Sequence, residues 1–378
     1  MNWSPDSKIV ASTTATGIPG GYKVRWWSVQ DSNEITLPTY LTDIFGIKWL
    51  PDGKMLTLGP YQCQPGNNCD KKLRLWSAEG KIIADFGYIS PYYTNMQQIS
   101  WSPDLKYLAA YSDFQAPESK VWLWGMDGKL VTTLANSSEP FTWSPDSKIL
   151  ATSYTIYNQP TSPCADNTAS ANGVKLWNVE GKSLATICGY SSPLETLAWS
   201  PDGSTFATSS EDAVIKNDTR TQGLVRLISR NGQDKGKFAV SVPFISNLAW
   251  SPNGQVLAVT ARNGCSDCIS ISNGSAGGVL ELWTATGKQL TSAHNYSYSL
   301  AWSPDGKMLA SAAYLPEETG QTPNNLEVNA RIIKLWSGDG KLLNTLTAHT
   351  QPITKLVWSP DGQFLASTSS DGTVRLWK

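Results

Sequence analysis

The sequence has no long hydrophobic run and no block of like charge. Among its 378 residues, apolar runs reach only about five to eight residues before a polar or turn residue, which is too short to span a bilayer. The 30 basic and 31 acidic residues are spread along the chain, with a formal net charge of -1. Because nucleic acid and anionic lipid need a basic surface, we predict no nucleic-acid partner and no membrane insertion by this segment.

Residues for common enzyme chemistry are also scarce. The chain has two histidines, no Gly-x-Ser-x-Gly elbow and no phosphate-binding glycine-rich loop. Metal-dependent hydrolysis and nucleotide chemistry therefore lack their usual residues, and we predict no catalytic residue, no metal site and no cofactor. The start, "MNWSPDSK", has no basic segment leading into an apolar one, so no signal peptide is expected within these residues.

The chain does contain one short stretch many times over. "AWSPDGKMLASAA" at residues 301–313 has seven relatives elsewhere, such as "FTWSPDSKILATS" and the looser "IKWLPDGKMLTL". The first tryptophans of the copies lie 42 to 56 residues apart, a period that suggests a propeller blade or a helix pair. These tryptophans are Trp3, Trp49, Trp101, Trp143, Trp199, Trp250, Trp302 and Trp358.

Each repeat is predicted to form four antiparallel strands, a to d. Runs such as "KMLASAA" and "RIIKLWS" are rich in β-branched and aromatic residues and end at Pro, Gly, Asp or Asn, and no stretch shows a sustained helical period. The Ser-Pro-Asp-Gly turn joins strands a and b: Pro fixes φ, Asp accepts backbone N–H bonds and Gly takes a positive φ. A second turn, as in "WSGDGK", joins c to d. Such small sheets are stabilised by stacking around an axis.

All 17 tryptophans follow this pattern, eight at the end of strand a and nine in strand c. A catalytic or ligand-stacking tryptophan would be expected outside the repeat, so we predict that these indoles pack between neighbouring sheets.

These features resemble the WD40-repeat β-propeller family over essentially the whole chain, and we take the chain for a bacterial-type member. The closest match is the last unit, "LTAHTQPITKLVWSPDGQFLASTSSDGTVRLWK". There His349, Ser367, Asp371 and Trp377 fall on the family's hydrogen-bonding tetrad, which the resemblance implies is structural and not a catalytic triad. Other units depart from it. His294 stands in a comparable loop, Tyr190 replaces His, and Ile228 replaces the strand-c tryptophan.

The fold is therefore predicted to be all-β, a WD40-type propeller forming one domain over residues 1–378. Eight blades are favoured, the first lacking most of strand a and the last lacking strand d. The alternative is seven blades built from residues 34–377. The resemblance implies that about fifteen residues upstream of Met1 would supply the missing strands, so we expect the chain to be trimmed from a longer protein.

Almost all length variation lies between strands b and c. In a propeller these loops emerge beside the d–a loops on one face, and confinement of insertions to one face suggests a recognition surface on a rigid scaffold. The alternative is that the other turns are too constrained to accept insertions. Candidate contact residues at this face are Tyr61, Phe114, Tyr154, Tyr157, Arg262 and Tyr314.

Six cysteines lie in or beside the same loops. Candidate disulfides are Cys63–Cys69, Cys265–Cys268 and Cys164–Cys188. A zinc site would need two cysteine pairs close together, but two of these pairs belong to opposite sides of the ring. Disulfides would indicate a secreted or cell-surface protein and free thiols a cytoplasmic one, so localisation stays open.

Three functions remain possible from the sequence. The leading hypothesis is a non-enzymatic scaffold or sensor that binds a protein or peptide on the b–c/d–a face, as part of a signalling protein. The second is an enzyme or small-ligand binder that uses the central channel, where Lys355, Glu195 and Asn247 lie near the inner strands. The third is a structural domain needed only for oligomerisation.

Overall fold

Every regular element in the described part of the chain is a β-strand, paired antiparallel with its neighbours. The computed structural model describes residues 1–15, 22–30, 34–36, 46–49, 55–61, 70–76, 82–88, 96–112, 120–155, 172–216, 219–262, 278–313, 331–347 and 349–378. The all-β prediction is confirmed.

The strands form consecutive sheets, each corresponding to one repeat of the sequence. Blades 1 to 3 contain β1 (Asn2–Trp3), β2 (Ile9–Ala15), β3 (Tyr22–Ser28) and β4 (Glu34–Thr36); β5 (Gly46–Trp49), β6 (Met55–Tyr61), β7 (Asp70–Trp76) and β8 (Ile82–Tyr88); and β9 (Met96–Trp101), β10 (Tyr107–Ser112), β11 (Lys120–Gly125) and β12 (Leu130–Ala135). Blades 4 and 5 contain β13 (Ser138–Trp143), β14 (Ile149–Thr155), β15 (Asn172–Asn178) and β16 (Ser183–Tyr190); and β17 (Leu194–Trp199), β18 (Thr205–Lys216), β19 (Thr219–Ser229) and β20 (Asp234–Val240).

The last three blades are less regular. Blades 6 and 7 share one seven-stranded sheet of β21 (Phe244–Trp250), β22 (Val256–Arg262), β23 (Gly278–Thr284), β24 (Gln289–Trp302), β25 (Met308–Ala313), β26 (Ile332–Ser337) and β27 (Leu342–Thr347). Blade 8 contains β28 (Ile353–Trp358), β29 (Leu365–Ser369) and β30 (Val374–Trp377), with no fourth strand among the described residues. The prediction of eight blades, with a short first strand and an incomplete last blade, is confirmed, and the seven-blade alternative is wrong.

Strand β24 corrects one expectation about the loops. His294 does not lie in a d–a loop, because β24 runs unbroken from the d position of blade 6 into the a position of blade 7, and His294 pairs with Val279 inside it. Other d–a connections contain a proline, as at Pro193 and Pro243, whereas residues 289–302 contain none. Since proline removes a ladder donor, its absence lets the strand continue.

The strand-a tryptophans of blades 4 to 8 join each of these blades to the blade before it. The Trp302 Nε1–H donates to the Ala249 carbonyl (3.0 Å), which precedes Trp250 in the neighbouring blade. The same bond to the residue before the neighbouring tryptophan recurs from Trp143, Trp199, Trp250 and Trp358, at 3.0 to 3.3 Å. These indoles therefore have a polar as well as an apolar role, which was not predicted.

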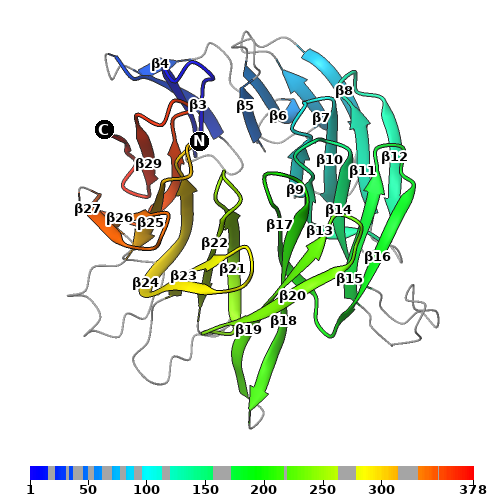
Figure 1. Ribbon diagram of the computed structural model, residues 1–378. Helices are drawn as coiled ribbons and strands as arrows, with labels where there is room; N and C mark the ends of the chain where they lie inside the picture. The colour runs from blue at the N-terminus through cyan, green and yellow to red at the C-terminus, as the bar shows by residue number, and fades with distance from the viewer. Residues whose placement is uncertain are drawn as a thin grey trace.

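The same bond closes the ring between its first and last blades. The Trp3 Nε1–H donates to the Val357 carbonyl of blade 8 (3.1 Å), and the Trp3 ring stacks on Phe364 with centroids 6.5 Å apart. The Asp361 N–H also donates to the Ser7 Oγ across this seam. Figure 1 shows the first blade, in blue, beside the last, in red, with the two ends of the chain close together.

The hydrophobic core is divided among the gaps between blades. Between blades 4 and 5, for example, Leu176 and Ile187 pack against Trp199, Phe206 and Ile228, all buried. Burying one such side chain contributes about 1.5–3 kcal/mol. Because neither blade covers these faces alone, folding of one blade depends on its neighbours, as predicted from the repeat.

The a–b turns have the predicted geometry. In blade 7 the Asp305 Oδ1 accepts the Lys307 N–H (3.0 Å), and Gly306 has a φ of +70°. The turn serine has a further role: the Ser303 Oγ donates to Asp305 (2.6 Å) and accepts the Met308 N–H (2.9 Å). Its counterparts in the other described turns are likewise buried, namely Ser4, Ser102, Ser144, Ser200, Ser251 and Ser359.

Leu105 provides a test of this turn geometry. It occupies the glycine position with a φ of +59°. The left-handed region costs a non-glycine residue roughly 1–2 kcal/mol, partly offset by the larger unfolded-state entropy of glycine. We expect Leu105→Gly to raise the free energy of unfolding by about 0.5–1 kcal/mol in urea titrations.

The reverse substitution is Gly254→Ala. Gly254 has a φ of +71°, and an added Cβ would meet only Pro201 Cδ at 3.7 Å, so the backbone conformation and not crowding is tested. A loss of about 1 kcal/mol is expected; if neither variant changes the urea midpoint, the turn is not under this constraint.

The turn aspartates predict how stability depends on pH. A hydrogen bond from the turn serine is the first cause that lowers the pKa in Asp6, Asp202, Asp305 and Asp361. Because the folded-state pKa lies below the unfolded value of about 3.9, this stabilisation is complete above that value and is lost as pH falls. The melting temperature should stay level from about pH 7 to 5 and drop below about pH 4.

A matched control comes from blade 6, where Asn253 accepts the same serine bond from Ser251 (2.7 Å) without a charge. Asp305→Asn should therefore show a smaller drop of the melting temperature between pH 5 and 3. A wild-type melting temperature that is unchanged over that range would contradict this prediction.

Candidate binding face

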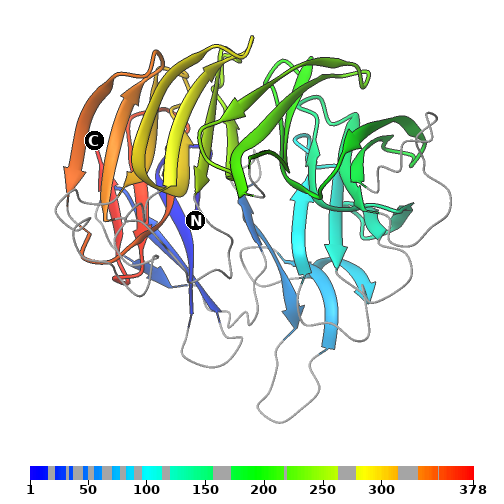
Figure 2. The same ribbon diagram turned by 90° about the horizontal axis from the view of Figure 1, so that it is seen from below.

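The chain segments that vary most in length lie at one end of the blades. Because strands a to d alternate in direction, every b–c connection leaves the blade at the same end as the d–a connection. In Figure 2 strands of neighbouring blades run side by side, so their ends collect at two opposite faces. We call the end with the b–c and d–a connections the loop face.

Blade 5 raises a two-stranded arm above this face. β18 and β19 stay paired as far as Lys216 and Thr219, although β17 pairs with β18 only up to Ser210 and β20 pairs with β19 only back to Gly223. The arm extends past its neighbours at the lower edge of Figure 1. The sequence had indicated only a long loop here.

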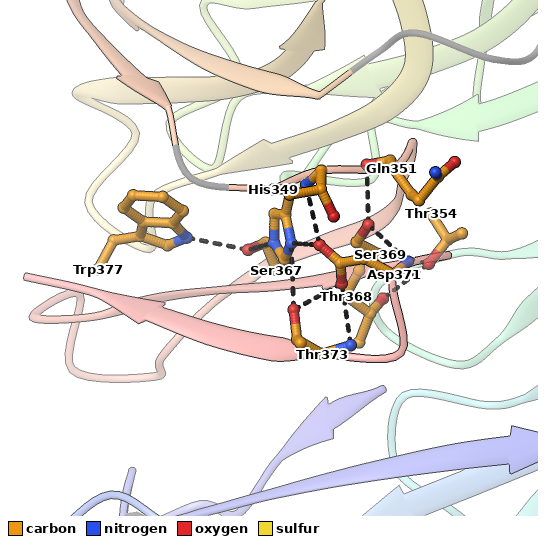
Figure 3. A network of polar contacts seen from close by, with 10 residues as sticks. His349, Gln351, Thr354, Ser367, Thr368, Ser369, Asp371, Thr373 and Trp377 are labelled. Carbon is orange, nitrogen blue, oxygen red and sulfur yellow. Dashed lines mark hydrogen bonds and ion pairs between the residues drawn. The ribbon is translucent and has the colours of Figure 1, made fainter.

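The four tetrad residues of blade 8 lie together in the structure (Figure 3). His349, before β28, places its Nδ1 2.9 Å from the Asp371 Oδ2 and its Nε2 2.7 Å from the Ser367 Oγ. The Trp377 Nε1–H donates to the same Ser367 Oγ (2.9 Å). Because a carboxylate only accepts, Nδ1 carries the proton, and in a neutral imidazole Nε2 accepts from the Ser367 hydroxyl.

This network holds a loop and offers no nucleophile to a substrate. Ser367 is fully buried and His349 nearly so, and the Ser367 Oγ already accepts the Trp377 N–H. Burial would raise the pKa of Asp371, but hydrogen bonds from Thr373 and His349 outweigh it and hold that pKa well below its usual range. The carboxylate therefore stays ionised and ties the d–a loop to the b–c hairpin.

Other blades use different residues at the same places. The position of Ser367, two residues after the strand-b partner of the strand-a tryptophan, is Thr152 in blade 4. The Thr152 Oγ1 accepts the Trp177 Nε1–H (3.0 Å) and donates to the Ser137 Oγ (3.1 Å), so Ser137 stands where blade 8 has His349.

In blade 5 Tyr190 takes the histidine place. Its hydroxyl lies 2.9 Å from the Thr208 Oγ1, and the Arg226 guanidinium lies 4.4 Å from its ring centroid. Arg226 also donates to the Cys188 carbonyl (3.0 Å) and to Asp234 (2.9 Å). Tyr190 therefore contacts the strand-b hydroxyl of Thr208, as His349 contacts that of Ser367 in blade 8. This explains how blade 5 keeps the contact with tyrosine in place of histidine.

In blade 6 a buried carboxylate takes the place of these hydroxyl networks. Val259 occupies the serine position and cannot accept a hydrogen bond; its cross-strand partner is Glu281. The fully buried Glu281 accepts the Trp283 Nε1–H at Oε2 (3.0 Å) and the Ser241 N–H of the d–a loop at Oε1 (3.1 Å). One carboxylate therefore does what three side chains do in blade 8. In the sequence, this role is signalled by the acidic residue two positions before the strand-c tryptophan, because six other repeats have Lys or Arg at that position.

The candidate contact residues are only partly described. Tyr61 ends β6 opposite Asp70, and Arg262 ends β22 half-buried. Phe114, Tyr157 and Tyr314 lie outside the described residues. These positions remain candidates for the loop face.

Tyr154 is a correction. Its side chain is fully buried, because its ring lies against Gly173, its cross-strand partner, where an added Cβ would meet the hydroxyl at 2.6 Å. The Lys175 ammonium covers the ring at 5.4 Å, and burial lowers the Lys175 pKa. Tyr154 therefore cannot contact a partner in this structure.

Cys188, in β16, is disulfide-bonded, and no free thiol occurs among the described residues. Its bonding partner lies outside them, as do Cys63, Cys69, Cys164, Cys265 and Cys268. The pairing Cys164–Cys188 therefore stays a prediction.

An open depression of about 260 Å³ lies between β21, β24 and β28 of blades 6, 7 and 8. Its lining is mixed, with Asn247, Ser299, Leu300, Thr354, Lys355 and Leu356. No group of three potential metal ligands occurs among the described residues, and no helix there is long and apolar enough to cross a membrane.

Comparison with known proteins agrees with this architecture. Residues 287–314 and 340–378 match the WD domain, G-beta repeat, and residues 125–287 match the ELP1 first N-terminal β-propeller. The Sif2 C-terminal WD40 domain superposes with a TM-score of 0.63 at 13% identity, covering 99% of this chain and 93% of that chain. The fold is a WD40-type propeller. The Dos1 propeller superposes with a TM-score of 0.64 at 13% identity, covering 99% of this chain and 90% of that chain, and supports the same conclusion.

Three curated relatives of this chain are fungal. WD repeat-containing protein slp1 of Schizosaccharomyces pombe is 23% identical over 342 residues, which cover 81% of this chain and 62% of slp1. Meiotic fizzy-related protein 1 of the same yeast is 22% identical (54% and 52% covered), and protein hir1 of Aspergillus terreus is 24% identical (81% and 30% covered). The chain thus spans less than two thirds of each, and the bacterial-type assignment finds no support.

Proposed function

We propose that this WD40-type propeller is a non-enzymatic scaffold or sensor that binds a protein or peptide segment on its loop face. The observation that carries the proposal is the blade 5 arm, a two-stranded β-ribbon that extends from the face where the b–c and d–a connections meet. Binding residues are often carried by elaborated connections on a rigid scaffold, and here the interblade tryptophans and buried polar networks make the scaffold rigid.

The comparisons lend support of a general kind. Slp1 is by name a WD repeat-containing protein, and a chain of the mitotic checkpoint complex has the same fold, with a TM-score of 0.53 at 17% identity over 88% of this chain and 86% of that chain. A chain that takes part in a complex is consistent with a scaffold role here.

The test compares four forms of the protein in affinity capture with quantitative mass spectrometry. One variant replaces residues 212–222 of the arm by Asn-Gly, since a two-residue turn can close the remaining hairpin. A control variant, Lys129→Glu with Lys341→Glu, alters exposed side chains at the opposite face. We expect the control variant to retain the partners that the wild type captures. The arm variant should lose them, and so should a further variant in which residues 155–173 and 314–330 are shortened. Equal capture by all forms would refute the use of this face.

A second candidate is a small-ligand site in the channel. The open depression between blades 6, 7 and 8 favours it, because Lys355, Thr354 and Asn247 together offer one positive charge and several hydrogen-bonding groups. A small carboxylate should then raise the melting temperature of the wild type and not of Lys355→Ala; no shift in the wild type would exclude it.

A further inference from the structure

A disulfide joins the scaffold of blade 4 to the loop face. Cys188, in β16, is disulfide-bonded, and the other five cysteines lie outside the described residues. Each of the five falls between strands b and c of its blade: Cys63 and Cys69 between β6 and β7, Cys164 between β14 and β15, and Cys265 and Cys268 between β22 and β23. Whichever of them is the partner, the bond therefore ties a residue of strand d to a b–c connection.

Cys188 lies where strand d reaches the loop face. Cys188 and Gly189 form a bulge opposite Gly173 in the pairing of β15 with β16. Cys188 is half-buried, and Gly189 is exposed with a φ of +84°. A small thiol in solution can therefore reach this bond.

The surroundings of Cys188 favour its release as a thiolate. The Tyr154 hydroxyl lies 3.6 Å from the Cys188 Sγ, and the hydroxyl donates because a disulfide sulfur carries no hydrogen. The Lys175 ammonium covers the Tyr154 ring at 5.4 Å. The Arg226 guanidinium donates to the Cys188 carbonyl (3.0 Å). A hydroxyl donor and nearby positive charge stabilise a thiolate, and a better leaving thiolate makes disulfide exchange faster.

The bulge that carries the disulfide also contacts blade 5. Arg226, in β19, donates to the Gly189 carbonyl (3.3 Å) and lies over the Tyr190 ring, 4.4 Å from its centroid. The Tyr190 hydroxyl lies 2.9 Å from the Thr208 Oγ1 of the same blade. The bond is therefore anchored at the junction of blades 4 and 5, beside the d–a connection.

We propose that this disulfide is a redox switch that controls binding at the loop face. With the bond formed, one b–c connection is held at a third point besides its two strands. It then has fewer conformations and loses less entropy when a partner binds. Reduction removes this restraint and weakens binding. The inference rests on the proposed function, because the switch acts on the face named there.

The reductant of the switch is a dithiol. One of its thiolates attacks the sulfur of the partner cysteine, the S–S bond breaks, and the electron pair leaves on the Cys188 Sγ, which takes up a proton. The second thiol then displaces the partner cysteine and closes a cyclic disulfide. Two electrons and two protons pass to the protein, and the dithiol is oxidised.

The first test examines the bond itself. Digestion of the alkylated, unreduced protein should give the Cys188 peptide cross-linked to a b–c peptide, and we expect that peptide to contain Cys164. Dithiothreitol, a dithiol, should reduce the bond in the folded protein. Hydrogen exchange at residues 188–190 should then become at least tenfold faster.

The second test measures affinity capture by the oxidised wild type, the dithiothreitol-treated wild type and Cys188→Ser. We expect capture to fall at least tenfold on reduction, and to the same level in Cys188→Ser without reductant. Dithiothreitol should cause no further loss in Cys188→Ser, which makes this variant the control for the other cysteines. Reduction of the wild type needs no substitution, so a folding defect of the variant does not conceal the result.

Several results would overturn the switch. A Cys188 thiol that is alkylated in the untreated protein would do so, and so would a bond that dithiothreitol reduces only after unfolding. Equal capture by oxidised and reduced wild type, or a further loss in reduced Cys188→Ser, would also overturn it. Capture that depends on the blade 5 arm but not on Cys188 leaves the proposed function intact, whereas capture that depends on neither refutes both.

Discussion

Glu281→Ala is expected to lower the free energy of unfolding by about 3 kcal/mol, because each buried donor left unpaired costs about 1–3 kcal/mol. The substitution removes the acceptor of two N–H groups, the indole of Trp283 and the backbone of Ser241. Urea unfolding monitored by tryptophan fluorescence measures the loss. The d–a loop before β21 should also exchange its amide hydrogens faster.

Two related variants separate hydrogen bonding from packing. Glu281→Gln keeps the shape and one acceptor oxygen, so it should lose less stability than Glu281→Ala. Val259→Ser in the Glu281→Ala background restores the hydroxyl that blade 7 uses, where the Ser311 Oγ accepts the Trp336 N–H (3.0 Å). It should recover about 1 kcal/mol. If the serine recovers nothing, the unpaired indole is not the source of the loss.

Trp3→Ala should destabilise the protein by about 4 kcal/mol, the usual range for truncating a buried aromatic side chain. The larger effect is expected on cooperativity. Blades 1 and 8 are 354 residues apart in sequence at the Trp3–Val357 bond, so within this chain only non-covalent contacts hold them together. Hydrogen exchange should accelerate in β1, β2, β28 and β29 before the rest of the ring.

Trp250→Ala is the matched control, since its indole makes the same bond to the Ala198 carbonyl (3.1 Å) but between blades that are joined by the chain. Its loss of stability should be similar in size, with no selective opening of blades 1 and 8. If both variants open the same region, the seam between the first and last blades is not a weak point of the ring.

The repeat and its turns were predictable because they rest on local chemistry. A serine, a proline, an aspartate and a residue with positive φ make the a–b turn from contacts within six residues, as at Ser303 to Met308. The tryptophan spacing then counts the blades. The incomplete first and last blades followed from the same count.

The candidate site was less predictable. Tyr154 was read as a loop residue open to a partner, but the glycine opposite it leaves room for the ring inside the blade. His294 was placed in a loop comparable to that of His349, although β24 runs unbroken through this position. Both errors concern which residue lies across the strand or where the strand ends. The spacing of residues along the sequence does not show either.

Sequence alone was sufficient for strand type, turn chemistry, blade number and the blade 8 tetrad positions, because each depends on residues close together in the chain or on a regular period. Tertiary structure was needed to show that the indoles bond from blade to blade and that Glu281 replaces a serine network beside Val259. Those features depend on which side chains meet across strands and blades, and packing alone decides that.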